Sequence, residues 1–351
     1  MCTGYDYIPL NPAKHKALMD EINDFMNKLF PEKALCEYMW DHLASTLMGT
    51  SANQTFNMYI GIGQNGKSVL VDLMSKVLGD YKGDVPLTLV TDKRGKVGGL
   101  QPEIVELKGK RYAVMQEPSK DDVINEGVMK QLTSGKDPIQ GRAPYAPQTI
   151  SFIPQFKLVV CCNTLMGIKA NDHGTWRRIR TVPFKALFTE NPVQGDKEKP
   201  YQFKLDKYID EKFDSWKEVF AAMLVQRAFI TKGVVTDCDI VMEMSKEYRK
   251  SQDYIAEFIQ ERIQRSPGSV LKKTDVNLEF SVWYQGNYGG RCPSPKNLHE
   301  YMDKEFGRQQ NGSWNNIKIK YDRGSNDGDS EAGADDDDTG DFDDGIGNDD
   351  I

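Results

Sequence analysis

The spacing of apolar residues along the chain predicts helices at the start, followed by strands that alternate with helices. Residues 11–48 carry apolar side chains at helical spacing in two groups that Pro31 separates, so we expect two helices there. Residues 56–60, 111–115 and 156–162 are short runs of apolar and β-forming residues, and helical spacing follows the first of them. The last run is almost continuously apolar, as in strands that are buried on both faces of a parallel sheet. The pattern therefore predicts an α/β domain around a central parallel sheet.

The C-terminal third shows a different pattern. Residues 201–265 have helical apolar stripes and predict a helical lid or continuation of the first domain. Residues 266–268, Ser-Pro-Gly, are expected to form a linker. Beyond them, the pattern predicts helices over 274–284 and 296–306 and a strand over 314–320. This order suits a winged-helix-like module that could bind DNA, and it equally suits a structural cap.

Charge is distributed unevenly along the 351 residues. The whole chain carries a formal charge of −7, and residues 322–351, with twelve Asp, one Glu and one Arg, account for −12 of it, so residues 1–321 carry +5. A tail with so few apolar residues cannot offset the entropy of ordering, and we expect it to be disordered. It could compete with DNA for basic surfaces, recruit a basic partner or simply add solubility. The mildly basic remainder is compatible with nucleic-acid binding.

These patterns divide the chain into five expected parts. They are an N-terminal helical region (1–50), an α/β core (51–200), a helical lid or continuation (201–265), a winged-helix-like module (266–321) and a disordered acidic tail (322–351). The N-terminal helices could form a layer beside the core or, by analogy alone, a collar for self-assembly.

Cysteine usage and hydropathy indicate a reduced, intracellular protein. The six cysteines are scattered without a C-x-x-C pair, so the sequence indicates neither a zinc site nor a disulfide scaffold. No apolar run approaches the ~20 residues that cross a bilayer, and the first residues do not have the pattern of a signal peptide. We therefore expect no membrane partner.

The segment after the first predicted strand carries the clearest chemical signal. Residues 61–68 read GIGQNGKS and fit the phosphate loop G-x-x-x-x-G-K-[ST], between a strand and a helix as that motif requires. Glycines let backbone N–H groups curl around phosphate oxygens, and the start of the helix adds partial positive charge. Lys67 is expected on the β and γ phosphates of ATP, and Ser68 on Mg²⁺. The residues expected to bind the nucleotide are Gly61, Gly63, Gln64, Asn65, Gly66, Lys67 and Ser68.

Two later predicted strands end in polar residues that suit ATP hydrolysis. Glu117 follows residues 111–115, where an ATPase places the carboxylate that orients Mg²⁺ and polarises the attacking water. Asn163 follows residues 156–162, and its amide could hydrogen-bond a γ-phosphate oxygen and that water. Asn163 could instead cap the following turn, and many strands end in an acidic residue that has no catalytic role.

Basic residues gather in two further segments. Lys136, Arg142 and Tyr145 lie in a Pro- and Gly-rich stretch that predicts a hairpin-like excursion, suited to contact with a nucleic-acid backbone or to plain exposure to solvent. Arg177 and Arg178 follow the last predicted strand of the core and could neutralise charge on a transferring phosphoryl group, or anchor a sheet edge through carboxylates. The pattern alone leaves both pairs of alternatives open.

As an ordered set, these motifs resemble the superfamily-3 helicases of DNA viruses, and more narrowly the helicase half of the poxvirus-type primase-helicases of nucleocytoplasmic large DNA viruses. The resemblance spans residues 5–320. It implies an AAA+-like P-loop NTPase that forms a hexameric ring, hydrolyses ATP between subunits and unwinds DNA from 3′ to 5′. The expected partners are single-stranded and forked DNA and a primase module or other replication proteins. The expected location is the infected host cell, at a cytoplasmic replication site or in the nucleus.

The resemblance also implies roles for single residues of the nucleotide site. Lys67 and Ser68 correspond to the phosphate and Mg²⁺ residues, Glu117 to the catalytic acid and Asn163 to the polar sensor. Gln116 precedes Glu117 where the family often has a second acid, so the residue on the Mg²⁺ side stays open.

Other implied roles concern DNA and the neighbouring subunit. Lys136 and Arg142 fall near the hairpin that contacts DNA in the pore, and Arg178, with Arg177 as second choice, corresponds to the arginine finger. No primase motif is recognised, so we expect either a fragment of a longer primase-helicase or a naturally split one. A DNA-packaging or remodelling ATPase, a small-molecule kinase and a non-catalytic DNA-binding scaffold are the rival interpretations.

Overall fold

The computed structural model describes residues 1–92, 100–116, 118, 122–169, 172–288 and 292–320. The chain divides into two compact units, residues 1–254 and residues 255–351. The first unit contains the predicted α/β core, and the second contains the predicted C-terminal module. The predicted acidic tail, residues 322–351, lies outside the described residues, so its disorder stays a prediction.

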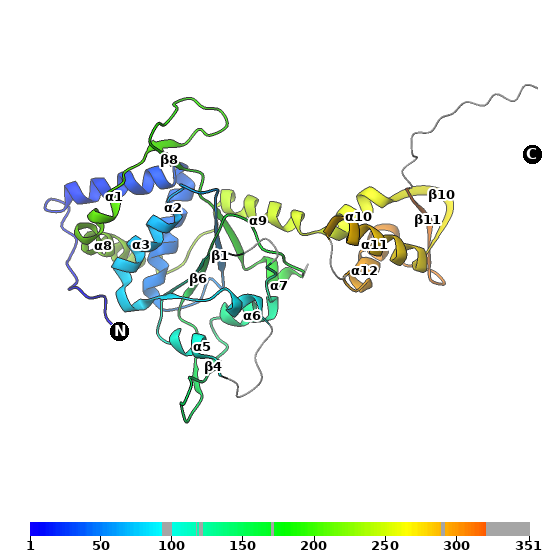
Figure 1. Cartoon of the computed structure of the whole chain (residues 1–351), viewed down its shortest axis with the longest axis horizontal. Coiled ribbons are helices and arrows are strands. Elements are labelled where there is room, and N and C mark those ends of the chain that lie inside the picture. The colour runs from blue at the N-terminus through cyan, green and yellow to red at the C-terminus, as the bar shows by residue number, and fades with distance from the viewer. Residues whose placement is uncertain (93–99, 117, 119–121, 170–171, 289–291, 321–351) are drawn as a thin grey trace, which may run out of the picture. The chain divides into compact units, whose positions relative to one another are not determined.

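Five parallel strands form the centre of the first unit (Figure 1). In spatial order they are β2 (Lys82–Asp84), β3 (Tyr112–Gln116), β6 (Lys157–Cys162), β1 (Phe56–Ile60) and β7 (Ile179–Pro183). The register places Ile60 opposite Cys162 on one side and Pro183 on the other. Because the strands are parallel, their carboxyl ends share one edge of the sheet. The predicted parallel sheet is confirmed, although β7 was not predicted as a strand.

One face of the sheet packs on four long helices, drawn together in Figure 1. They are α1 (Lys16–Leu29), α2 (Lys33–Ser45), α3 (Lys67–Leu78) and α8 (Phe213–Thr231). Strand residues such as Tyr59 and Val114 share their core. The two predicted N-terminal helices are therefore part of the core of the first unit, as in the helical-layer alternative.

The other face packs on shorter helices. Met58 and Met115, the strand neighbours of residues on the first face, share a second core with α4 (Thr88–Thr91), α6 (Glu126–Leu132), α7 (His173–Trp176) and α9 (Asp239–Ser251). Side chains of a strand alternate between its two faces, so a strand with both faces covered is apolar along its whole length. This three-layer α/β arrangement explains the continuous apolar run of β6.

Small elements complete the first unit. They are the helix α5 (Pro102–Glu106), the antiparallel hairpin of β4 (Ile139–Gly141) and β5 (Ile150–Phe152), the parallel pair of β8 (Leu187–Thr189) and β9 (Gln202–Lys204), and the 3₁₀ turns η1 (Thr46–Met48), η2 (Gly79–Tyr81) and η3 (Ile209–Lys212). The predicted excursion around residue 145 is thus a hairpin loop, which leaves the body of the unit near β4 in Figure 1.

The second unit has its own apolar core. Its elements are α10 (Tyr254–Arg262), β10 (Ile263–Lys272), α11 (Lys273–Tyr288), α12 (Lys296–Phe306) and β11 (Ser313–Ile319). The rings of Phe258, Phe280 and Trp283 pack with centroids 5.1 to 6.4 Å apart. Strands β10 and β11 pair antiparallel and complete a winged-helix-like fold with one more strand than the sequence predicted.

The predicted linker at residues 266–268 is wrong. These residues lie inside β10, where the pairing with β11 shifts between Arg265 and Val270. A bulge tolerates a proline, because residues in a bulge need not donate a backbone hydrogen bond to the neighbouring strand. It also tolerates the φ of +78° at Gly268, which favours glycine. The unit boundary accordingly lies after Tyr254, so α10 of the predicted lid belongs to the second unit. Among the described residues, no helix has both the length and the apolar composition to span a membrane.

Candidate nucleotide-binding site

The loop between β1 and α3 has the backbone conformation that the phosphate-loop motif predicts. Gly63, Gln64 and Gly66 have φ values of +45°, +50° and +80°, and α3 begins directly afterwards at Lys67. A Cβ on Gly61 would lie 2.1 Å from Asn65 Nδ2 and 2.7 Å from the Phe184 carbonyl oxygen, so only glycine fits there. The first N–H groups of α3 have no partner within the helix, and that of Lys67 makes only a long hydrogen bond of 3.5 Å to Asn65 Oδ1, so an anion could bind to them.

Lys67 and Asn163 meet at the carboxyl edge of the sheet. Lys67 Nζ donates to Gly61 O at 2.5 Å, to Asn163 Oδ1 at 3.1 Å and to Asn65 Oδ1 at 3.2 Å. Asn163 reaches this position because β6, which it follows, pairs directly with β1. Burial lowers the pKa of Lys67 below its ordinary value, since water solvates the ammonium poorly here. Anionic phosphate oxygens would stabilise the charged form.

A cavity of about 570 Å³ opens at this edge. Its described lining residues are Gly63, Gln64, Asn65, Gly66, Lys67, Ser68, Val69, Gln116, Pro118, Cys161, Asn163 and Thr164. None of these is acidic, and Asn65 Nδ2 is a buried donor without a partner in the structure. An excess of donors over acceptors suits a polyanion, so the residues present fit the phosphates of ATP.

The expected Mg²⁺ residues are only partly described. The Ser68 side chain is exposed at the cavity. Glu117 lies outside the described residues, whereas its neighbours Gln116 and Pro118 line the cavity. Among the described residues, no group of three or more His, Cys, Asp and Glu side chains could hold a metal ion alone.

Arg177 and Arg178 lie at the opposite edge of the sheet. The Arg178 carbonyl accepts from the N–H of Phe56, the first residue of β1, while the phosphate loop leaves β1 after Ile60. Four residues of strand separate the two edges by about 13 Å. Neither arginine therefore joins the phosphate cavity of its own chain.

The two arginines differ in exposure. Arg177 is exposed and donates to Gln54 Oε1 at 2.8 Å, whereas Arg178 is only 9% exposed and donates to the Gly174 carbonyl oxygen at 2.5 Å. Arg180, two residues further on, makes two hydrogen bonds to Asp237, at 2.8 and 3.0 Å. The alternative of a sheet edge anchored by a carboxylate therefore applies to Arg180.

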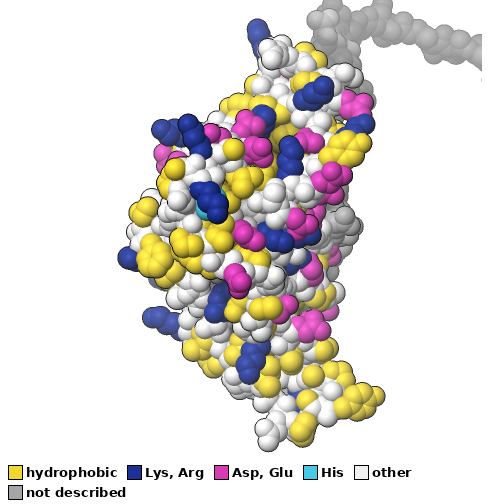
Figure 2. Space-filling view, turned by 90° about the vertical axis from the view of Figure 1, so that its left-hand side faces the viewer, with side chains coloured by type: hydrophobic (Ala, Val, Ile, Leu, Met, Phe, Trp, Pro, Cys, Tyr) yellow, Lys and Arg dark blue, Asp and Glu magenta, His cyan; other side chains and the backbone are white. Residues whose placement is uncertain are grey.

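The three residues expected to contact DNA are differently placed. Lys136 is exposed between α6 and β4, and Tyr145 is fully exposed in the hairpin loop with a φ of +61°. Arg142 is half-buried, and its carbonyl accepts from the Gln101 N–H at 3.0 Å. On the face of the first unit that Figure 2 shows, basic and acidic side chains are interspersed and neither kind forms a continuous patch.

Sequence patterns did not reveal one neighbour of the phosphate loop. The backbone N–H of Phe188, in β8, donates to the Gln64 carbonyl oxygen at 2.8 Å. No motif marks this residue, because the contact depends on the path of the chain after β7.

Comparisons with known proteins find relatives in large DNA viruses. No protein-family profile matches the chain. It is 34% identical over 311 residues to a protein of Acanthamoeba polyphaga mimivirus named as a putative helicase, covering 86% of this chain and 32% of that protein. It is 30% identical over 286 residues to a Frog virus 3 protein also named as a putative helicase, covering 79% and 29%. An African swine fever virus protein named as a putative primase is 28% identical over 295 residues, covering 80% and 30%.

The chain spans about a third of the length of these curated relatives. Among solved structures, the apo C-terminal region of NrS-1 aligns with a TM-score of 0.48 at 15% identity, covering 74% of this chain and 57% of that one. The sequence relatives and the phosphate-loop core together identify the family: this chain is homologous to proteins of large DNA viruses that are named as putative helicases and putative primases.

Proposed function

We propose that the chain is the motor of a replicative DNA helicase, which hydrolyses ATP between neighbouring copies in a ring. One observation carries this proposal. The phosphate cavity and the Arg177–Arg178 pair lie at opposite edges of one parallel sheet, so either of these two arginines could assist hydrolysis only in a second copy. The helicase names of the viral relatives support the same activity.

In the proposed cycle, Lys67 and the start of α3 bind the phosphates of ATP. Lys67 Nζ would exchange its bonds to Gly61 and Asn163 for phosphate oxygens. Asn163 is then free to orient a water molecule toward the γ phosphorus, and Glu117 is the proposed base that polarises this water. Ser68, with Glu117, would hold Mg²⁺, which neutralises charge on the phosphates when bound.

An arginine of the adjacent copy completes the proposed site. We assign this role first to Arg177, because its guanidinium is exposed, and second to Arg178. Exposed apolar side chains at the end of α8 and in the following turn, Phe229 and Val234 among them, support a protein interface nearby. Val234 follows Gly233, whose carbonyl oxygen accepts from the Asn53 amide at 3.0 Å, and Asn53 precedes Gln54, the hydrogen-bond partner of Arg177.

We further propose that the hairpin of β4 and β5 contacts single-stranded DNA, with movement from 3′ to 5′ along a fork. Lys136 and Arg142 would meet backbone phosphates, and Tyr145 would stack on a base.

The proposed assembly is a hexamer that works with a primase module or other replication proteins in the infected cell.

A mixing experiment tests hydrolysis across a subunit interface. Lys67→Ala and Arg177→Ala are each expected to lower ATP turnover by at least about 10²-fold, but their mixture forms some interfaces with an intact lysine on one side and an intact arginine on the other. Turnover should therefore return in the mixture and scale with the fraction of such interfaces. Native mass spectrometry establishes that mixed assemblies form. Mixed assemblies without recovered turnover, or a fully active monomer, would contradict the proposal.

Strand separation distinguishes the helicase from its rivals. A packaging or remodelling ATPase would hydrolyse ATP in a ring without opening a forked duplex. A non-catalytic scaffold would bind DNA with no turnover for Lys67→Ala to remove. A small-molecule kinase would consume ATP only with an acceptor substrate.

A further inference from the structure

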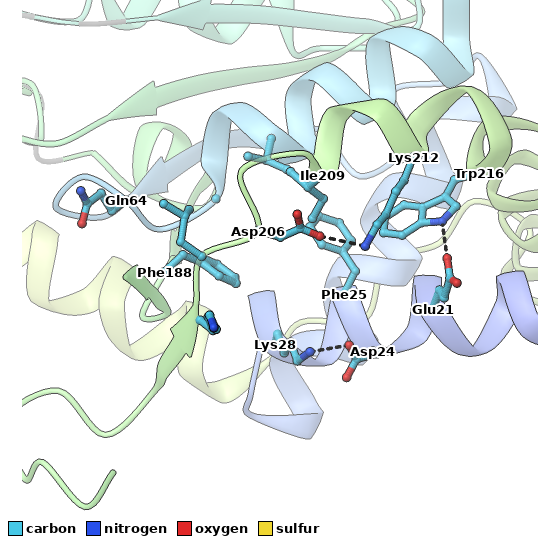
Figure 3. A pocket seen from close by; sticks show the side chains of 14 residues that line it. Glu21, Asp24, Phe25, Lys28, Gln64, Phe188, Asp206, Ile209, Lys212 and Trp216 are labelled. Carbon is cyan, nitrogen blue, oxygen red and sulfur yellow. Dashed lines mark hydrogen bonds and ion pairs between the residues drawn. The ribbon is translucent and has the colours of Figure 1, made fainter. Parts of the chain in front are cut away.

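A second cavity lies beside the phosphate loop, among α1, β8 and α8 (Figure 3). Its volume is about 220 Å³, and Gln64, Gly66 and Val69 line both this cavity and the phosphate cavity. The loop and the first turn of α3 therefore form the boundary between the two. The two cavities are therefore close enough for one ligand to be considered for both.

Aromatic and aliphatic side chains form the inner wall of the second cavity. Phe25 of α1 and Trp216 of α8 are buried, with ring centroids 5.6 Å apart. Phe188 and Ile209 extend this wall toward the phosphate loop, as Figure 3 shows. Such a wall suits a flat ring system.

Charged side chains at the rim are paired with one another. Lys28 Nζ lies 2.5 Å from Asp24 Oδ2, and Lys212 Nζ lies 2.8 Å from Asp206 Oδ2 (Figure 3). All four side chains are at least 40% exposed, so these ion pairs are weak and can exchange partners. The rim therefore offers both donors and acceptors to the polar edge of a base and to ribose hydroxyls.

Phe188 connects the wall to the phosphate loop. Its N–H donates to the Gln64 carbonyl oxygen at 2.8 Å. A Cβ on Gly66 would lie 3.2 Å from a ring carbon of Phe188 and 2.5 Å from Leu29 Cδ1. The Phe188 ring is thus held at the boundary between the cavities.

We propose that the second cavity binds the base and ribose of the nucleotide whose phosphates occupy the phosphate loop, and that Phe188 positions the base. This inference rests on the proposed function. It makes α1, in the predicted N-terminal helical region, part of the nucleotide site. An organic ring joined to a polyphosphate is the ligand that fits an apolar cavity adjacent to a donor-rich one.

Calorimetric titration with ATP and with inorganic tripolyphosphate tests this assignment, because the second ligand lacks the base and ribose. Phe188→Ala removes the ring and keeps the backbone bond to Gln64, and Ile209→Trp fills the cavity from a residue outside the loop. Each should weaken ATP binding about tenfold, the usual scale of one stacked base, and change tripolyphosphate binding less than twofold. Phe203→Ala is the matched control, since Phe203 packs on Phe188 at 5.9 Å but does not line the cavity.

Three results would overturn the assignment. If Lys67→Ala weakens both ligands while the Phe188 and Ile209 variants bind ATP normally, the base lies elsewhere and the proposed function stands. If the wild-type protein binds neither ligand, the proposed function fails and the base site fails with it. If the Phe188 and Ile209 variants lose affinity for an oligothymidylate instead of ATP, the cavity holds a DNA base.

Discussion

The two edges of the central sheet use buried cations in different ways. At the carboxyl edge, Lys67 lies against a cavity of about 570 Å³, and its partners are the oxygens of Gly61, Asn65 and Asn163. At the amino edge, Lys157 donates to the Thr50 carbonyl oxygen, and Arg178 donates to the Gly174 carbonyl oxygen. At both edges, oxygen atoms of the chain accept hydrogen bonds from the buried cation and so offset the free-energy cost of removing it from water.

The difference lies in what else can reach these cations. A ligand entering the cavity can replace the partners of Lys67, whereas the chain itself encloses Lys157 and Arg178, which are 4% and 9% exposed. Arg177 is exposed beside them and lies on the wrong edge to reach the cavity of its own chain. The carboxyl edge thus leaves its cation open to a small ligand, whereas the amino edge leaves only Arg177 exposed among these three residues.

Arg177→Ala tests the amino edge and has the largest expected effect. If Arg177 acts on a neighbour's ATP, the substitution lowers kcat by about 10³-fold, at the low end for arginine fingers, and leaves nucleotide binding nearly intact. Steady-state turnover of the assembled protein measures the change.

Arg178→Ala is the matched control. It should lower turnover far less, and it should cost about 1–3 kcal/mol of unfolding free energy, because its guanidinium is buried and bonded to the Gly174 carbonyl oxygen. If Arg178→Ala abolishes turnover and Arg177→Ala does not, the order of the two residues reverts to the one that the sequence suggested.

Lys67→Ala tests the carboxyl edge. Removing a cation that is aimed at developing phosphate charge should lower turnover by about 10²–10³-fold. Because Lys67 also meets ground-state phosphates, ATP affinity should fall as well, unlike in Arg177→Ala. Calorimetry with a non-hydrolysable analogue separates the two effects, and unchanged affinity would remove Lys67 from the binding site.

Lys157→Met tests the enclosed lysine of the amino edge. Burial lowers the pKa of Lys157 from 10.5 to about 8 in the folded chain. Between these values the unfolded chain holds more protons, so this residue makes the fold more stable as pH rises. The contribution from pH 7.5 to pH 9.5 is about 2 kcal/mol, and Lys157→Met should remove it.

Urea unfolding of both proteins at these two pH values measures the effect as a difference. The comparison cancels the opposite contribution of buried thiols such as Cys36, whose pKa burial raises to about 11. Turnover should survive the substitution, because Lys157 lies away from the cavity. If the unfolding free energy of the two proteins changes equally between the two pH values, water reaches Lys157 in the folded state.

The fold followed from the sequence where local pattern and tertiary environment agree. Strands β1, β3 and β6 lie within one residue of the predicted runs, and the predicted helix 296–306 is α12. The pattern failed at β10, because a Ser-Pro-Gly run is typical of a linker and also of a bulge. Only the pairing with β11, about fifty residues later, decides between them.

The sequence predicted those parts of the nucleotide-binding site whose positions follow from the order and direction of the strands. Lys67 and Asn163 meet because carboxyl ends of adjacent parallel strands share an edge, a rule that the sequence could invoke. Arg177 is exposed and Arg178 is buried because of the packing around α7. The sequence alone does not show which of two adjacent arginines will be exposed. The cavity at Phe188 draws on α1, β8 and α8, which no local motif connects.

Tyr145→Ala has the smallest expected effect and concerns neither edge. Its fully exposed ring stands in the hairpin loop, where stacking on a base would contribute about 1 kcal/mol, a fivefold change in affinity for single-stranded DNA. Because tyrosine is uncharged, the salt dependence of binding should stay the same, whereas Lys136→Ala should reduce its slope by about one counterion. Fluorescence anisotropy with a labelled oligothymidylate at several salt concentrations distinguishes the two residues. If both variants bind DNA like the wild type, the DNA contact lies outside this hairpin, and the comparison of the two sheet edges still holds.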